Sequence, residues 1–191
     1  MYYAFIENNE INGTGQCRCL NDDIQNIEIS EEIYNNIDKY IWNGTEIVLN
    51  PNYDAEQLAK AKDAKYEEAN LKAFQYLESG EAVFEFEEGK SIEATDGNIA
   101  KLGLALVNFI LQQDYTSTIE WNTKENENVQ LNAEQLQTIV AGLQYIQSVV
   151  WTIKFPAYNT AISEATTIQE VEAIEIDYTI PQENEDENVG K

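Results

Sequence analysis

The most regular pattern of apolar positions along the chain lies between Asn132 and Phe155. Apolar residues recur there about every 3.6 positions, which predicts a helix with one apolar face. These residues are Leu136, Ile139, Val140, Leu143, Ile146, Val149, Val150 and Ile153. Asn132 can accept a hydrogen bond from the first turn, and Gln135 is spaced to bond back, so the pair predicts a capping box at the helix start.

A second, shorter helix is predicted after Pro156, which we expect to end the first. Thr167 and Glu170 repeat the spacing of a capping box. The helix that they begin would carry Val171 and Ile174 on its apolar side.

Strands and one further helix are predicted between residues 80 and 131. Val83–Phe86 and Ser91–Ala94 flank Glu88-Gly89-Lys90 as a hairpin, and residues 115–121 read as a strand that ends at Trp121, a predicted core residue. A helix capped by Thr95 or Asp96 would run through Ile99, Leu102, Leu106, Val107 and Ile110. Residues 129–131 are interpreted as a turn. Together these elements predict an α+β fold in which an antiparallel sheet packs on helices.

Residues 1–50 are predicted to form a small β-rich module. Strands are expected at residues 2–7, 15–20 and 27–29, with a turn over residues 8–13 and a short helix that begins at Ser30. Tyr40–Trp42 and Glu46–Leu49 alternate about Asn43-Gly44, which predicts a hairpin with a type I′ turn.

A long helix is predicted from Asp54 to Ser79, with Asp54 and Gln57 as a capping box. Its first half is rich in alanine and can bury little, so it would be either a solvated connector or a helix that pairs with copies of itself or with a neighbouring protein. The predicted domains are therefore a β-rich module (1–53), a connecting helix (54–79), an α+β module (80–177) and an acidic tail (178–191), which is disordered or bound to a partner.

Charge limits the partners that the chain can bind. The 191 residues contain 35 acidic and 11 basic side chains, for a net charge of −24, and Arg18 is the only arginine. With so few basic side chains to neutralise phosphates, the surface is not expected to bind nucleic acid or anionic lipid. Scattered acidic residues favour a solvated surface, and the alternative is a nucleic-acid mimic. Without a run of about 18 apolar residues or a basic leader, neither a membrane span nor a secretory signal is expected.

The side chains available argue against catalysis. The chain has no histidine, which excludes histidine-based nucleophilic systems and histidine-ligated metals. Cys17 and Cys19 are the only thiols, predicted on one face of a strand and reduced. One chain cannot complete a four-coordinate zinc site with them, and the alternative is a site shared across an oligomer axis. Carboxylates such as those of Glu85 to Glu88 alternate with Phe84 and Phe86 and would face solvent. We expect no enzyme, no cofactor and no metal site.

The order of elements resembles a known group of proteins. Residues 121–176 follow the pattern W-x-T, V-x-L, a long helix and then A-I-x-x-A-T-T-x-x-E-V-x-A-I. This pattern is similar to a C-terminal module of uncharacterised phage and prophage tail proteins. The N-terminal order, from Tyr2-Tyr3-Ala4 to the hairpin at Trp42-Asn43-Gly44, is similar to the small N-terminal module of tail-fibre-associated proteins.

The resemblance implies a non-catalytic structural protein of the phage tail or baseplate, an adaptor that links tail or fibre components. Its partners would be other tail, baseplate or fibre proteins, and it would reside in the virion and, during assembly, in the host cytoplasm. Two alternatives are a tail-fibre assembly factor absent from the virion and an acidic inhibitor of a host defence enzyme.

Three aromatic residues are the predicted interface. Tyr145, Trp151 and Phe155 lie on the helix that begins at Asn132 but extend its apolar surface beyond one face. A single small sheet can hardly cover them all. We therefore expect a homo-oligomer, or a stable contact with a neighbouring tail protein, through these residues.

Overall fold

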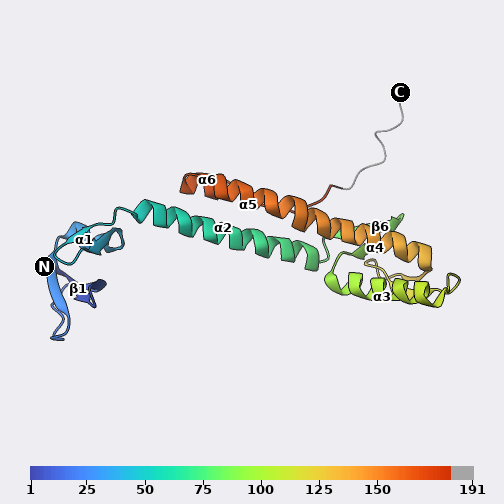
Figure 1. The fold of residues 1–191 in the computed structure, drawn as a ribbon, viewed down its shortest axis with the longest axis horizontal. Coiled ribbons are helices and arrows are strands. Elements are labelled where there is room, and N and C mark those ends of the chain that lie inside the picture. The colour runs from blue at the N-terminus through green and yellow to red at the C-terminus, as the bar shows by residue number, and fades with distance from the viewer. Residues whose placement is uncertain (182–191) are drawn as a thin grey trace, which may run out of the picture. The chain divides into compact units, whose positions relative to one another are not determined.

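The computed structural model describes residues 1–181 (Figure 1), and the acidic end, residues 182–191, lies outside the described residues. The chain divides into two compact units, Met1–Lys60 and Ala61–Lys191. Both contain helices and antiparallel strands, so the predicted α+β class is confirmed.

The first unit is built on a three-stranded antiparallel sheet. Strand β1 (Tyr2–Glu7) lies between β2 (Glu10–Gly15) and β3 (Gln25–Ile29). Its small core consists of Tyr3, Ala4, Ile6 and Ile29. Helix α1 (Glu31–Asn35) starts at the predicted place, and Ser30 is its cap. A 3-10 turn (Ile37–Lys39) and the hairpin of β4 (Tyr40–Trp42) and β5 (Ile47–Leu49) follow.

The turns of this unit differ from those predicted. The turn expected over residues 8–13 contains only Asn8 and Asn9, whose φ angles of 52° and 66° meet the requirement of a type I′ hairpin. The predicted type I′ turn at Asn43-Gly44 is wrong, because only Gly44 has a positive φ there. The Asn43 side chain instead accepts hydrogen bonds from the N–H groups of Thr45 and Glu46, both at 2.9 Å.

The cysteines do not lie on a strand. Strand β2 ends at Gly15, so the prediction of a strand through Cys17 and Cys19 is wrong. The backbone of Cys19 bonds to the Asn26 side chain: its N–H donates to Asn26 Oδ1 at 2.7 Å, and its carbonyl accepts from Asn26 Nδ2 at 3.0 Å. The Asn26 side chain therefore makes the two hydrogen bonds that a neighbouring strand would otherwise offer to the backbone of Cys19.

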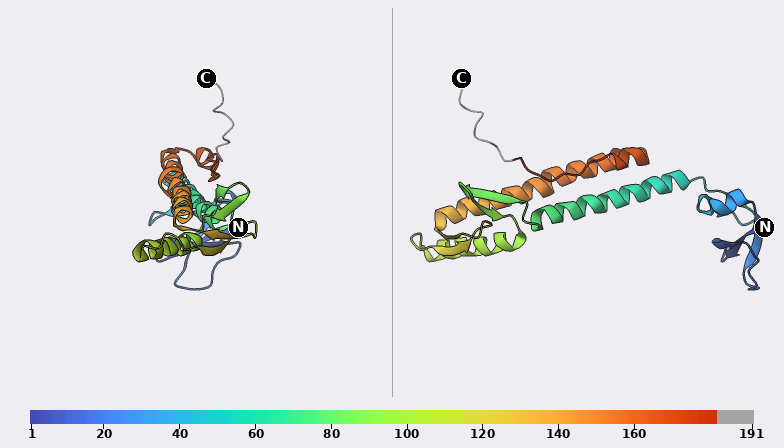
Figure 2. Two further views of the ribbon diagram at one scale, coloured as in Figure 1. Left: turned by 90° about the vertical axis from the view of Figure 1, so that its right-hand side faces the viewer. Right: turned by 180° about the vertical axis from the view of Figure 1, so that it is seen from behind.

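The second unit contains an antiparallel pair of long helical segments. Helix α2 (Tyr53–Glu78) begins one residue before Asp54, so Asp54 lies inside the first turn and is not the predicted cap. From Ala61 on, α2 runs beside α4 (Ala133–Ser148) and α5 (Phe155–Glu164) in both orientations (Figures 1 and 2). Lys62 Nζ on α2 donates to the Ser163 carbonyl at 2.7 Å, and Ala69, Ala73 and Leu77 enter the core.

The helix that starts at Asn132 does not end at Pro156. A π-helical segment (Val149–Lys154) joins α4 to α5, and Pro156 lies in the first turn of α5. The N–H of Phe155 reaches back five residues to the Val150 carbonyl. Proline has no N–H to donate, and a change to the wider π register just before it lets the helical run continue. The short α6 (Ile168–Glu172) follows, with the predicted Thr167–Glu170 capping box in place.

Two hairpins and one helix complete the unit. The hairpins are β6 (Val83–Glu87) with β7 (Lys90–Glu93), and β8 (Ile119–Asn122) with β9 (Asn128–Leu131). Residues 129–131 are thus a strand, not the predicted turn. Strand β8 starts later than predicted because the Asp114 carboxylate holds Thr116 and Ser117 in a turn. Helix α3 (Asp96–Gln112), capped by Thr95, packs on α4.

Candidate interaction surfaces

The structure brings two of the three predicted interface residues together. The Trp151 ring lies 5.4 Å from the Phe155 ring and 4.9 Å from that of Phe74 on α2, both in edge-to-face geometry. We call these three residues the aromatic cluster. Tyr145 lies apart from it in sequence and is 65% exposed.

The aromatic cluster is only partly covered. Trp151 and Phe155 pack against the core with part of their surface accessible, and Phe74 is 51% exposed. Helix α2 therefore supplies part of the cover that the sequence alone left open. Sequence reasoning missed Phe74, because its partner lies 77 positions further along the chain and nothing local marks the pair.

A second apolar surface lies on α3. Leu102 and Phe109 are buried, whereas Leu104 is 63% exposed and Leu111 is 76% exposed; Val107 and Ile110 are about half exposed. The exposed residues Ala100, Leu104, Val107 and Leu111 are separated by four, three and four positions. They therefore follow one side of the helix, and we call them the α3 seam.

A pocket adjoins the end of α3. It has a volume of about 250 Å³, and its walls include Leu106, Ile110, Tyr115, Ala133 and Gln137. The apolar surface of α3 therefore continues into a hollow formed with the first turn of α4.

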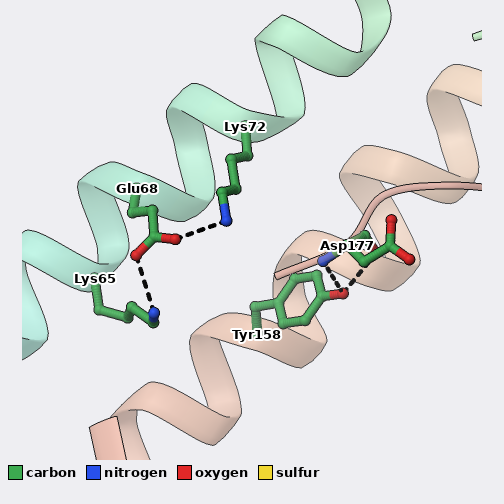
Figure 3. Close-up of polar contacts among 5 residues, drawn as sticks. All are labelled: Lys65, Glu68, Lys72, Tyr158 and Asp177. Atoms are coloured by element: carbon green, nitrogen blue, oxygen red, sulfur yellow. Dashed lines mark hydrogen bonds and ion pairs between the residues drawn. The ribbon is translucent and has the colours of Figure 1, made fainter. Parts of the chain in front are cut away.

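The segment after α6 is bound to the second unit. The Tyr158 hydroxyl donates to the Asp177 carbonyl at 2.6 Å and accepts from the Asp177 N–H at 2.9 Å (Figure 3). Lys154 Nζ donates to the carbonyls of Asp177 and Thr179 at 3.0 and 2.6 Å. The N–H of Ile180 donates to the Tyr76 hydroxyl on α2.

Tyr178 corrects the predicted limit of the tail. Residues 178–191 were expected to be disordered or bound to a partner, but Tyr178 is 3% exposed, and its ring meets that of Tyr158 at 5.4 Å. Burial, with the nearby Tyr158, raises the pKa of Tyr178 to about 12. The apolar residues Ile176 and Tyr178 enter the core of the unit, so the folded part extends at least to Ile180.

Three charged residues of α2 form two ion pairs along that helix. Glu68 accepts from Lys65 at 2.9 Å and from Lys72 at 2.8 Å (Figure 3). The hydrogen bonds from Lys72 and then Lys65 lower the pKa of Glu68. These contacts satisfy local charges on a partly solvated helix and contribute little to stability.

Ser91 and Glu125 place a serine hydroxyl beside a carboxylate, a pair that could in principle act as nucleophile and base. Glu125 accepts from the Ser91 hydroxyl at 2.5 Å and from the Ser91 N–H at 3.0 Å, and the Lys124 N–H donates to the Ser91 carbonyl. The hydrogen bonds from Ser91 lower the pKa of Glu125 to about 2. A carboxylate with so low a pKa is a weak base, so it is poorly suited to activate a serine. The contact instead joins the loop of the β8–β9 hairpin to β7.

Both cysteines are free, Cys17 exposed and Cys19 partly exposed. Within residues 1–181, no three cysteine or carboxylate side chains gather closely enough to hold a metal ion. No helix in the same range has the length and apolar character needed to cross a membrane.

Comparison with known proteins identifies the family and nothing finer. No curated protein and no solved structure matches the chain. One family model matches residues 54–179, more than half of the chain, and its end coincides with the bound segment around Tyr178. The chain therefore belongs to the family described as Domain of unknown function (DUF4376).

Proposed function

We propose that the protein is a non-catalytic structural component of a phage tail or baseplate, an adaptor that links tail or fibre components. The similarity of residues 121–176 and of the N-terminal module to tail-associated proteins supports the tail assignment. The observation that carries the binding role is that the second unit leaves large apolar side chains accessible at two places, the aromatic cluster and the α3 seam.

Accessible apolar groups of this size favour protein contacts. Soluble proteins seldom leave contiguous apolar surface in water unless it serves an interface. Aromatic residues are enriched at the centres of interfaces, where they bury much area with few rotatable bonds. The aromatic cluster is thus the proposed attachment point for another tail or fibre protein.

Mass spectrometry of purified particles tests the tail role. An adaptor that stays in the virion should be present in constant proportion to the tail proteins. Presence in the infected cell but absence from particles would instead indicate an assembly factor. Absence of any association with tail proteins, together with tight binding to a host defence enzyme, would support the acidic inhibitor.

A charge placed in the aromatic cluster tests the attachment point. Trp151→Glu should reduce incorporation into particles, because a carboxylate would be desolvated at the contact. Leu20→Glu, at a 95% exposed position of the first unit, is the matched control and should be incorporated normally. The melting temperature of both variants must be compared with that of the wild type, because loss of folding without a specific loss of binding would place Trp151 in the core.

A further inference from the structure

Helix α3 is apolar on both of its sides. Leu102 and Phe109 face the core, while the α3 seam lies in water on the exposed side. An apolar stripe on a helix is normally buried against another element, and α3 has two such stripes. Within residues 1–181 the seam residues Leu104, Val107 and Leu111 remain exposed, so the cover must come from outside the described chain.

The spacing of the α3 seam matches one particular kind of cover. Steps of four, three and four positions are the alternation found along the seam of a helix pair, where each side chain fits between side chains of the facing helix. The seam spans about three turns, given about 3.6 residues per turn. A helix is therefore the natural partner.

Charge favours a second copy of the same helix. From Gly97 to Gln113 the only charged residue is Lys101, although the chain carries a net charge of −24. Two copies repel each other wherever their acidic surfaces meet. Helix α3 itself carries no carboxylate from Gly97 on, so two copies can approach along it with little repulsion between the helices.

Side-chain size favours an antiparallel arrangement. When two α3 helices cross about the midpoint of the seam, Ala100 of one copy faces Leu111 of the other, and Leu104 faces Val107. Large residues thus meet smaller ones, which fills the contact evenly. The two Lys101 ammonium groups lie at opposite ends of this contact, whereas a parallel pair would place them together.

We infer that the α3 seam is the interface of a homodimer in which two α3 helices pack antiparallel about a two-fold axis. Such a contact is self-complementary and closed, so it does not propagate into a filament. The inference names one partner of the proposed adaptor but does not rest on its tail role. The aromatic cluster then remains free for a different protein.

Light scattering of the purified full-length chain at increasing concentration is the first test. The wild type should approach the mass of a dimer, and Leu104→Glu should halve that mass, because two carboxylates would be buried at the centre of the contact. Tyr145→Glu makes the same kind of change at an exposed position outside the seam and should remain dimeric. A wild type that is monomeric at high concentration would overturn the inference, as would a Leu104→Glu variant that is still dimeric.

Disulfide trapping tests the geometry without relying on a disruptive variant. In a chain that carries Cys17→Ser and Cys19→Ser, Ala100→Cys mixed with Leu111→Cys should give a cross-linked heterodimer upon oxidation. Each single variant alone should give far less. Efficient cross-linking of each variant with itself would indicate a parallel pair and would contradict the proposal. In particles, cross-linking of a Leu104→Cys variant to another tail protein would assign the seam to a different chain and would also contradict it. Light scattering and the cross-linking of Ala100→Cys with Leu111→Cys use only the purified chain, so their failure is separate from any failure of the tail role.

Discussion

Helices α3 and α4 have similar lengths and similar N-terminal caps but differ in how much of their apolar surface is buried. Each begins at a side-chain cap, Thr95 or Asn132, and each carries an apolar face. Helix α4 lies between α3 and the β6–β7 hairpin and continues into α5, so the residues of its predicted stripe are buried from Leu136 to Val150. The prediction is wrong for Ile153, the last residue of the stripe, which lies in the π-helical segment and is 60% exposed. Helix α3 packs on α4 with one side and leaves the other in water. Position in the fold, and not amphipathic design, decides how much of a helix is covered.

Truncation of one leucine on each helix should give the largest difference between them. Leu143→Ala on α4 should lower the free energy of unfolding by about 2–5 kcal/mol, because the side chain is fully buried and leaves a cavity. Leu104→Ala on the α3 seam should change it by less than about 0.5 kcal/mol. Urea denaturation at a concentration at which the chain is monomeric measures both. Equal losses would show that α3 is covered within the monomer.

The glycines of the two helices sharpen the comparison with an added methyl group. A Cβ at Gly142 on α4 would overlap the Phe84 ring of β6, whereas a Cβ at Gly103 on α3 meets open space. Gly142→Ala should destabilise the fold by about 1–3 kcal/mol through overpacking. Gly103→Ala should stabilise it by about 0.5–1 kcal/mol through helix propensity. The sign of each change in thermal unfolding is the decisive readout. A stabilised Gly142→Ala variant would refute the packing described for Gly142, and a destabilised Gly103→Ala variant would refute the open space at Gly103.

Removal of the N-terminal cap should destabilise α3 and α4 by similar amounts. Asn132 accepts from the Gln135 N–H at 2.9 Å, and Thr95 accepts from the Asn98 N–H at 3.2 Å. Asn132→Ala and Thr95→Ala should each cost about 1 kcal/mol, because a cap acts within a single turn and is indifferent to what covers the helix. Denaturant midpoints that differ widely between these two variants would show that tertiary contacts reach the caps.

The Ser91–Glu125 contact should produce the smallest effect, one confined to acid. The folded-state pKa of Glu125, about 2, lies below its ordinary value. The carboxylate therefore stabilises the fold fully above about pH 4.5, and this contribution is lost as the pH falls toward 2. Glu125→Gln should weaken this part of the pH dependence of thermal stability, and Glu120→Gln on β8 is the control. An unchanged acid profile in Glu125→Gln would show that the contact does not persist in solution.

The sequence by itself determined several features that depend on neighbours within one turn, although the predicted cap at Asp54 and the type I′ turn at Asn43-Gly44 were wrong. The capping boxes Asn132–Gln135 and Thr167–Glu170 lie where their spacing predicts, and a short helix starts at Ser30 as predicted. The α+β class and the stripe of α4 also follow from periodicity, because a repeat of about 3.6 residues marks one side of a helix wherever the helix lies.

Tertiary structure alone decided which apolar residues are covered and which remain available for a partner. Phe74 reaches Trp151, and Tyr178 enters the core from a segment whose composition indicated disorder. The helical run passes through Pro156 by a change of register that no local rule required. Burial depends on the surface offered by elements distant in sequence, whereas periodicity reports only that an apolar side exists. For this reason the sequence alone could not show that the α3 seam is left exposed.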